Sequence, residues 1–198
     1  VKAGAARGKE LVRQILAFSR HRAESFQAVQ IRRIAEKALE QLSAGMPENI
    51  MIHRDLRSDT PVRADPDQIQ QVLTNLFTNA THAMRQSGGT LDITVADVDI
   101  DSQSARQHPD LHQGRYVRLR VEDSGTGISA DIRDRVFEPF FTTKAVNQGS
   151  GLGLAIVHGI VKTHGGVIFL KTREAQGTRV DILLPAAEPD TGDAPAVL

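Results

Sequence analysis

Three glycine clusters are the parts of the sequence whose residue types and spacing most suggest ligand chemistry. They are DSGTG at 123–127, GSGLGL at 149–154 and Gly-Thr at 177–178. The second cluster runs directly into LAIVHGIVKTH, an apolar segment with helical periodicity. Backbone N–H groups at a helix N-terminus bind anions, and glycine leaves them uncovered. The cluster therefore predicts a polyphosphate-binding loop. Its glycines are Gly149, Gly151 and Gly153.

This loop matches neither of two common phosphate-binding motifs. No Lys-Ser or Lys-Thr pair follows its last glycine, as the Walker motif requires. No strand leads into it with a dinucleotide fingerprint and a later ribose-binding acid. A single glycine cluster more often forms an ordinary turn, so the loop alone leaves that alternative open.

Asp123 directly follows VRLRVE, a segment of alternating apolar residues that is typical of a strand. It precedes Gly125 and Gly127, so a flat ligand could approach the backbone closely at this strand end. The carboxylate could then accept a hydrogen bond from an exocyclic amine of that ligand. The alternative is an Asx turn, in which the side chain bonds only its own loop.

Asn75 and Asn79 lie one turn apart on the polar side of a predicted helix, residues 66–86. A side-chain amide oxygen is a hard ligand that suits a partly hydrated Mg²⁺ bound to phosphate oxygens. An asparagine on a helix surface is more often only solvated. Two asparagines opposite a strongly apolar face, in a chain that also has the glycine loops, favour the functional reading.

The elements that must position these residues follow from periodicity. Asp65 and Pro66 form an N-cap and a first helical position, so the helix 66–86 is well defined. Further helices are predicted at 9–20, 31–45 and 151–164. Strands are predicted in NIMIHRDL, PVRAD, TLDITVADVDI, RYVRLRVED, GVIFLKT and GTRVDILLP, with a polar loop at 101–114. The pattern predicts an α+β fold: a two-layer sandwich in which helices cover one face of a mixed, mostly antiparallel sheet.

The composition excludes several classes of protein. Lys plus Arg and Asp plus Glu number 24 each, so net charge gives no reason to expect nucleic acid or an anionic membrane as a partner. The chain has no cysteine, which excludes disulfides and thiolate metal sites. We find no apolar run of the roughly 20 residues that a membrane span needs and no secretory signal. We therefore expect a cytoplasmic domain without membrane contact.

Five segments, in order, resemble motifs of bacterial sensor histidine kinases. QQVLTNLFTNATHAM resembles the asparagine box, VEDSGTGIS the first glycine box and VFEPFFTTK the phenylalanine box. GSGLGLAIV resembles the second glycine box, and GTRVDILLP the final Gly-Thr segment. The resemblance spans about residues 26–186. It implies the ATP-binding sandwich of the GHKL superfamily, with ATP and Mg²⁺ as ligands and phosphoryl transfer to histidine.

The resemblance also assigns roles to single residues. Asn79 matches the magnesium-ligating asparagine, Asn75 faces the phosphates one turn earlier, and Asp123 matches the adenine-binding aspartate. Residues 128–150 would form the ATP lid, packed by Phe140 and Phe141, and Lys144 would lie near the phosphates. The remaining nucleotide-binding positions that it implies are Gly125, Gly127, Gly149, Gly151, Leu152, Gly153, Leu154 and Thr178. His82 stands where many members carry lysine, so a phosphate contact there competes with a plain surface histidine.

The family's phosphorylated histidine is usually followed by an acidic residue, and no histidine in this sequence is. Residues 1–25 resemble the second helix of the stem that carries the acceptor, and the chain begins at Val1 rather than at methionine. We therefore expect a fragment that lacks its acceptor histidine and cannot phosphorylate itself. The implied partners are that acceptor helix, a response-regulator receiver domain and a second subunit in a full-length homodimer.

Two other functions remain as alternatives. A GHKL ATPase that hydrolyses ATP would need a glutamate base one turn before the magnesium asparagine, where this chain has Asn75. A non-catalytic ATP sensor or scaffold would keep the same motifs. Residues 187–198 predict a solvated tail, or a linker to a receiver domain if the protein is a hybrid kinase.

Overall fold

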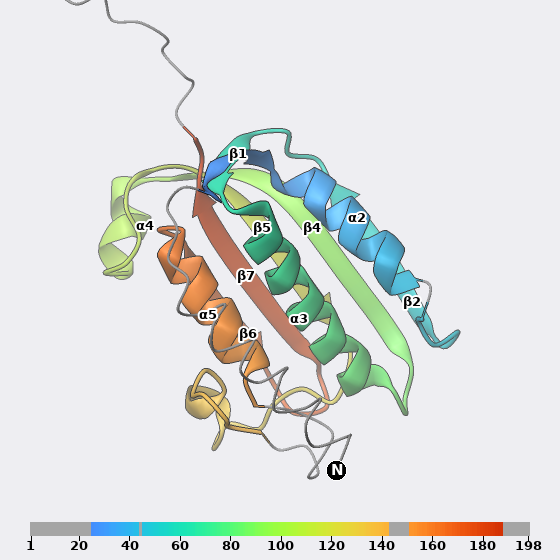
Figure 1. Ribbon diagram of the computed structural model, residues 1–198. Helices are drawn as coiled ribbons and strands as arrows, with labels where there is room; N and C mark the ends of the chain where they lie inside the picture. The colour runs from blue at the N-terminus through green and yellow to red at the C-terminus, as the bar shows by residue number, and fades with distance from the viewer. Residues whose placement is uncertain (1–24, 44, 143–150, 188–198) are drawn as a thin grey trace, which may run out of the picture.

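A five-stranded sheet with helices packed on one face forms the body of the molecule (Figure 1). The structure, a computed structural model, describes residues 25–43, 45–142 and 151–187. Its strands are β1 Gln27–Gln30, β2 Ile50–Leu56, β3 Pro61–Ala64, β4 Gly89–Ile100, β5 Gly114–Asp123, β6 Val167–Thr172 and β7 Thr178–Pro185. Its helices are α2 Ile31–Ser43, α3 Pro66–Met84, α4 Ser102–Gln107, η2 Arg133–Arg135 and α5 Gly153–Thr163. The predicted α+β sandwich is confirmed.

The central helix α3 begins as predicted. The Asp65 carboxylate accepts hydrogen bonds from the backbone N–H groups of Asp67, at 2.9 Å, and Gln68, at 3.3 Å. Its apolar side is buried between the sheet and the neighbouring helices α2 and α5. These buried residues are Ile69, Val72, Leu73, Leu76, Phe77, Ala80 and Met84. Burial of this face, rather than helix propensity, holds α3 on the sheet.

The large sheet has the order β2-β4-β5-β7-β6. Only β2 and β4 pair in parallel, so the sheet is mixed and mostly antiparallel, as predicted. In the register of β5 with its neighbours, Asp123 lies opposite Leu91 of β4 and Thr178 of β7. The first and third glycine clusters are therefore brought together at one end of the sheet.

The segment predicted as the polar loop 101–114 contains the short helix α4. Asp101 caps it by accepting a hydrogen bond of 2.7 Å from the Ser104 N–H. Part of this segment belongs to a second apolar cluster, separate from the main core. That cluster consists of buried Leu111, Tyr116, Val167 and Leu183, with Ile100 and Phe169 packed against it. Side chains alternate along a strand, so Tyr116 lies on the sheet face opposite to Val117 and the helices.

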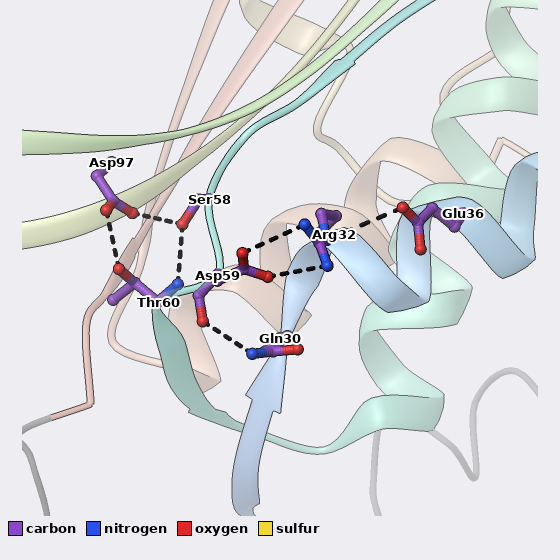
Figure 2. A network of polar contacts seen from close by, with 7 residues as sticks. All are labelled: Gln30, Arg32, Glu36, Ser58, Asp59, Thr60 and Asp97. Atoms are coloured by element: carbon purple, nitrogen blue, oxygen red, sulfur yellow. Dashed lines mark hydrogen bonds and ion pairs between the residues drawn. The ribbon is translucent and has the colours of Figure 1, made fainter.

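A strand that sequence periodicity did not predict, β1, pairs with β3 in a separate two-stranded sheet. Figure 2 shows the polar network beside it. Arg32 of α2 forms an ion pair with Asp59, and Gln30 donates to the Asp59 carbonyl at 3.1 Å. Ser58 and Thr60, in the same β2–β3 connection, both donate to Asp97 of β4. The network ties β1 and α2 to the large sheet.

In the part of the chain that the structure describes, no helix is long and apolar enough to cross a membrane.

Candidate functional site

Asp123, the last residue of β5, is 9% exposed. Its Oδ1 accepts a hydrogen bond of 2.9 Å from the backbone N–H of Gly125. Burial raises the pKa of Asp123 to about 6, although backbone hydrogen bonds from Gly125 and Thr178 favour the charged form. Among the described residues no basic side chain forms an ion pair with it. A buried carboxylate without a cation is typical of a ligand-binding site.

The glycines around Asp123 lie against the protein's own backbone. A Cβ on Gly125 would lie 2.7 Å from the Cβ of Ala83, in the last turns of α3. Gly127 has φ of +65°, and a Cβ there would lie 2.0 Å from the carbonyl oxygen of Arg173. These glycines therefore let the loop after β5 pack onto α3 and onto the β6–β7 turn. Close approach of a flat ligand to Gly125 and Gly127 stays a prediction.

Asn75 and Asn79 meet the start of α5. A Cβ placed on Gly153 would lie 3.5 Å from Oδ1 of Asn75 and 3.6 Å from Nδ2 of Asn79. The asparagines are half-buried, and α5 begins at Gly153 without a capping side-chain hydrogen bond. Two side-chain amides therefore lie next to a helix N-terminus, where backbone N–H groups and the helix dipole favour an anion.

The leucines of the second glycine cluster anchor the loop. Leu152 is buried in the main core, and Leu154 packs against it half-buried. If Leu152 and Leu154 contact a ligand, they would therefore do so through their backbone atoms rather than through their side chains. Gly151 has φ of +66°, and a Cβ there would lie 2.4 Å from the carbonyl carbon of Phe140, so the loop passes close to the phenylalanine segment.

Thr178 is supported by Thr172, a residue that the sequence analysis did not select. The two hydroxyl oxygens lie 3.1 Å apart. The Thr172 hydroxyl donates to the carbonyl of Gly177 at 3.1 Å and accepts from the N–H of Ile128 at 2.9 Å. Thr172 thus links the β6–β7 turn to the loop after Asp123. Thr172 could have been found by aligning the two predicted strands as a hairpin, because Thr172 pairs with Thr178 in that register.

The structure describes only some of the remaining predicted site residues. His82 is exposed near the end of α3, while Lys144 and Gly149 lie outside the described residues. Phe140 is 63% exposed, and its predicted packing in the lid stays a prediction because residues 143–150 lie outside the described residues. Phe141 is half-buried beneath the guanidinium of Arg135, which lies 4.5 Å from its ring centroid.

The arrangement suits an elongated ligand with a hydrogen-bond donor at one end and an anionic group at the other. Asp123 supplies a buried acceptor, while α5 supplies N–H groups beside the amides of Asn75 and Asn79. No group of three or more histidine or acidic residues that could hold a metal occurs within residues 25–43, 45–142 and 151–187. An amide oxygen of Asn75 or Asn79, together with the ligand's own oxygens, could hold a cation here.

Comparison with known proteins identifies the architecture. Residues 64–188 match the family of histidine kinase-, DNA gyrase B-, and HSP90-like ATPases. The chain is 37% identical to the sensor kinase CckA of Brucella abortus over 98% of its own length. It spans only 21% of that relative.

Two solved structures show the same fold. The catalytic domain of histidine kinase ThkA is 30% identical with a TM-score of 0.65, and the match covers 81% of this chain and 95% of that one. Full-length ShkA in complex with AMPPNP is 28% identical with a TM-score of 0.69, and the match covers 91% of this chain and 36% of ShkA. Together with the site geometry, the family match shows that this chain belongs to the histidine kinase-, DNA gyrase B-, and HSP90-like ATPases.

Proposed function

We propose that this chain is the ATP-binding catalytic domain of a sensor histidine kinase. The observation that carries the proposal is the approach of Gly153, at the start of α5, to Asn75 and Asn79 of α3. The buried carboxylate of Asp123 lies at the end of β5, where the loop after it packs against the last turns of α3. The relatives are named sensor and histidine kinases, and ShkA was solved with AMPPNP, a nucleotide analogue. These names favour the kinase over the other members of the family.

In this proposal Asp123 accepts a hydrogen bond from the adenine amine, supported by Thr178. The N–H groups around Gly151 and Gly153 bind the phosphates, and Asn79 ligates Mg²⁺ with Asn75 beside it. Bound Mg²⁺ would shield negative charge on the phosphate oxygens. Lys144, Gly149 and His82 keep their predicted positions near the phosphates.

The rest of the proposal concerns the longer protein. Residues 1–25 belong to a helical stem, residues 26–186 form the catalytic domain, and residues 187–198 are a tail or linker. The γ-phosphoryl group passes to a stem histidine outside this sequence and then to an aspartate of a receiver domain. The full-length protein is a homodimer whose catalytic part is cytoplasmic.

The two alternatives make different use of the same site. An ATPase with a glutamate base needs a carboxylate one turn before Asn79, and that position holds the half-buried amide of Asn75. A non-catalytic scaffold would bind nucleotide in the same way but would not transfer phosphate. Transfer to a supplied stem hairpin that contains an acceptor histidine separates the scaffold from the kinase.

Asn79→Ala tests the proposal directly. Loss of the amide ligand should reduce Mg²⁺-dependent binding of an ATP analogue at least about tenfold and abolish phosphotransfer to the supplied hairpin. Calorimetric titration with and without Mg²⁺ measures the first effect. Thr78→Ala, at the exposed neighbouring position of α3, is the matched control. Unchanged Mg²⁺-dependent binding in Asn79→Ala would contradict the assignment.

A further inference from the structure

The first two described residues contact both helices of the site, at the ends farthest from it. The Ser25 hydroxyl donates a hydrogen bond of 2.7 Å to Oδ2 of Asp65, the N-cap of α3. The ring of Phe26 stacks on the imidazole of His164, the C-cap residue of α5, with ring centroids 4.5 Å apart and planes 15° apart. Ser25 and Phe26 therefore contact the start of α3 and the end of α5 at the same point.

Asp65 and His164 are also bonded to each other. The backbone N–H of Asp65 donates to Nε2 of His164 at 3.1 Å, and Nδ1 of His164 lies 2.7 Å from the carbonyl oxygen of Ile160. Because Nε2 accepts, the proton of a neutral ring must sit on Nδ1, which then donates to Ile160. His164 is 7% exposed, and burial lowers its pKa, which favours this neutral form. We call Ser25, Phe26, Asp65 and His164 the helix joint.

The helix joint lies far from the site along both helices. Asn75 comes ten residues after Asp65, and Gly153 comes eleven residues before His164. At about 1.5 Å per residue, each lies roughly 15 Å from the joint. The two helices pack side by side in front of the sheet (Figure 1). A change of about 5° in the angle between them at the joint would shift Gly153 by about 1 Å relative to Asn75, enough to alter ligand contacts.

We propose that the helix joint sets the angle between α3 and α5 and thereby sets the affinity of the site for nucleotide. The proposal rests on the proposed nucleotide site. Asp65 and His164 are positioning residues in it, because they act through the helices and not by touching the ligand. Ser25 and Phe26 hold the two helix ends together through the hydrogen bond to Asp65 and the ring stack on His164.

Phe26→Ala in the full 198-residue chain is the first test. It removes the ring stack on His164 but leaves the hydrogen bond between Asp65 and His164. We expect affinity for an ATP analogue with Mg²⁺ to fall about fivefold. Phe26→Tyr, which keeps the stack, should restore it. Phe169→Ala is the matched control, because Phe169 is also half-buried and packs on a histidine, His108, at 4.9 Å, away from the helix joint.

A double-mutant cycle separates positioning from general loss of stability. If Phe26 acts through His164, Phe26→Ala should have little further effect on affinity in a His164→Ala background. All titrations are made at a temperature where circular dichroism shows every variant folded. Equal losses in Phe26→Ala and Phe169→Ala, additive losses in the cycle, or no loss in Phe26→Ala would each overturn the proposal.

A measurement without nucleotide keeps this test independent of the proposed function. NMR signals of the Gly153 amide and the Asn75 and Asn79 side-chain amides should shift in Phe26→Ala and stay in place in Phe169→Ala. If the wild-type chain binds no nucleotide, the proposed function fails, and these shifts alone decide whether the joint moves the helices. If these NMR signals do not shift in Phe26→Ala, the proposed role of the helix joint is contradicted, even if the chain binds nucleotide.

Discussion

Asp123 and Asp181 are two aspartates of the same sheet that are buried almost equally, with exposed fractions of 9% and 7%. Asp181, on β7, accepts from Nε of Arg120 and Nε of Arg179, each at 2.7 Å, and the net effect of its surroundings lowers its pKa. Asp123, at the end of β5, accepts only from backbone donors within the part of the chain that the structure describes, and burial raises its pKa to about 6. Burial disfavours the charge in each case, and only Asp181 has cations that outweigh it.

The difference indicates what each region does. The face of the sheet that carries Asp181, Arg120 and Arg179 satisfies its own charge, so that network stabilises the fold. At the end of the sheet, no described residue supplies a cation to the Asp123 carboxylate. Burying this charge costs stability unless a ligand supplies a donor. Functional sites often carry such a cost, because the ligand rather than the protein completes the interaction.

Asp123→Asn should have the largest effect. Removing the charged acceptor should lower affinity for an ATP analogue by about 100-fold, since hydrogen bonds to charged groups contribute about 1.5–3 kcal/mol. Calorimetry measures the affinity, and Asp181→Asn is the matched control because Asp181 is equally buried. Equal losses of nucleotide affinity in the two variants would contradict the assignment of ligand binding to Asp123 and of fold stability to Asp181.

Asp181→Asn should instead destabilise the fold. It leaves Arg120 and Arg179 without their shared carboxylate, and their side chains are only 22% and 30% exposed. We expect the free energy of unfolding to fall by about 2 kcal/mol, with nucleotide affinity little changed. Urea denaturation measures the loss. A variant as stable as the wild type would show that the network contributes no net stability.

The pH dependence of stability should have opposite sign at the two aspartates. The folded-state pKa of Asp123 lies above the ordinary value of 3.8, so stability is lost as pH rises from about 3.8, and the loss is complete above about 6. Asp123→Asn should therefore be more stable than the wild type by about 1–2 kcal/mol at pH 7.5. That gain should disappear near pH 4.

For Asp181 the folded-state pKa is lowered, so its stabilisation is present above 3.8 and is lost as pH falls below that value. Urea denaturation of the wild type and both variants from pH 3.5 to 8 measures both effects. A wild type that loses no stability relative to Asp123→Asn between pH 4 and pH 7 would contradict the raised pKa of Asp123.

Gly153→Ala probes the space between the start of α5 and the two asparagines, and it should lower nucleotide affinity less than Asp123→Asn does. A Cβ at this position makes ordinary contacts of 3.5 Å or more with Asn75 and Asn79, so the variant should fold normally. The added methyl group occupies the space between the amides and the helix start, and we expect nucleotide affinity to fall about tenfold. Gly45→Ala is the control, because a Cβ there meets nothing within 4 Å. Unchanged affinity would show that the phosphates do not approach Gly153.

Much of the fold could be predicted because its signals are local. The cap at Asp65, the proline after it and the apolar period of α3 lie within one segment, and the predicted 66–86 is close to the observed Pro66–Met84. The strand β1 and the helix α4 were missed for opposite reasons. β1 is stabilised by pairing with β3, more than 30 residues away, while α4 is short and polar and has no buried residue of its own.

The sequence by itself determined the ordered motifs, the fold class and most of the candidate residues, because residue type and spacing carry that information. Only the tertiary structure decided that Gly153 lies against Asn75 and Asn79, that Thr172 supports Thr178, and that His164 joins the cap of α3. It also decided which buried aspartate is compensated, since Arg120 is 61 residues from Asp181 in the sequence. The physical reason is that the energy of a buried charge depends on neighbours within a few ångströms, and those neighbours come from distant strands and helices.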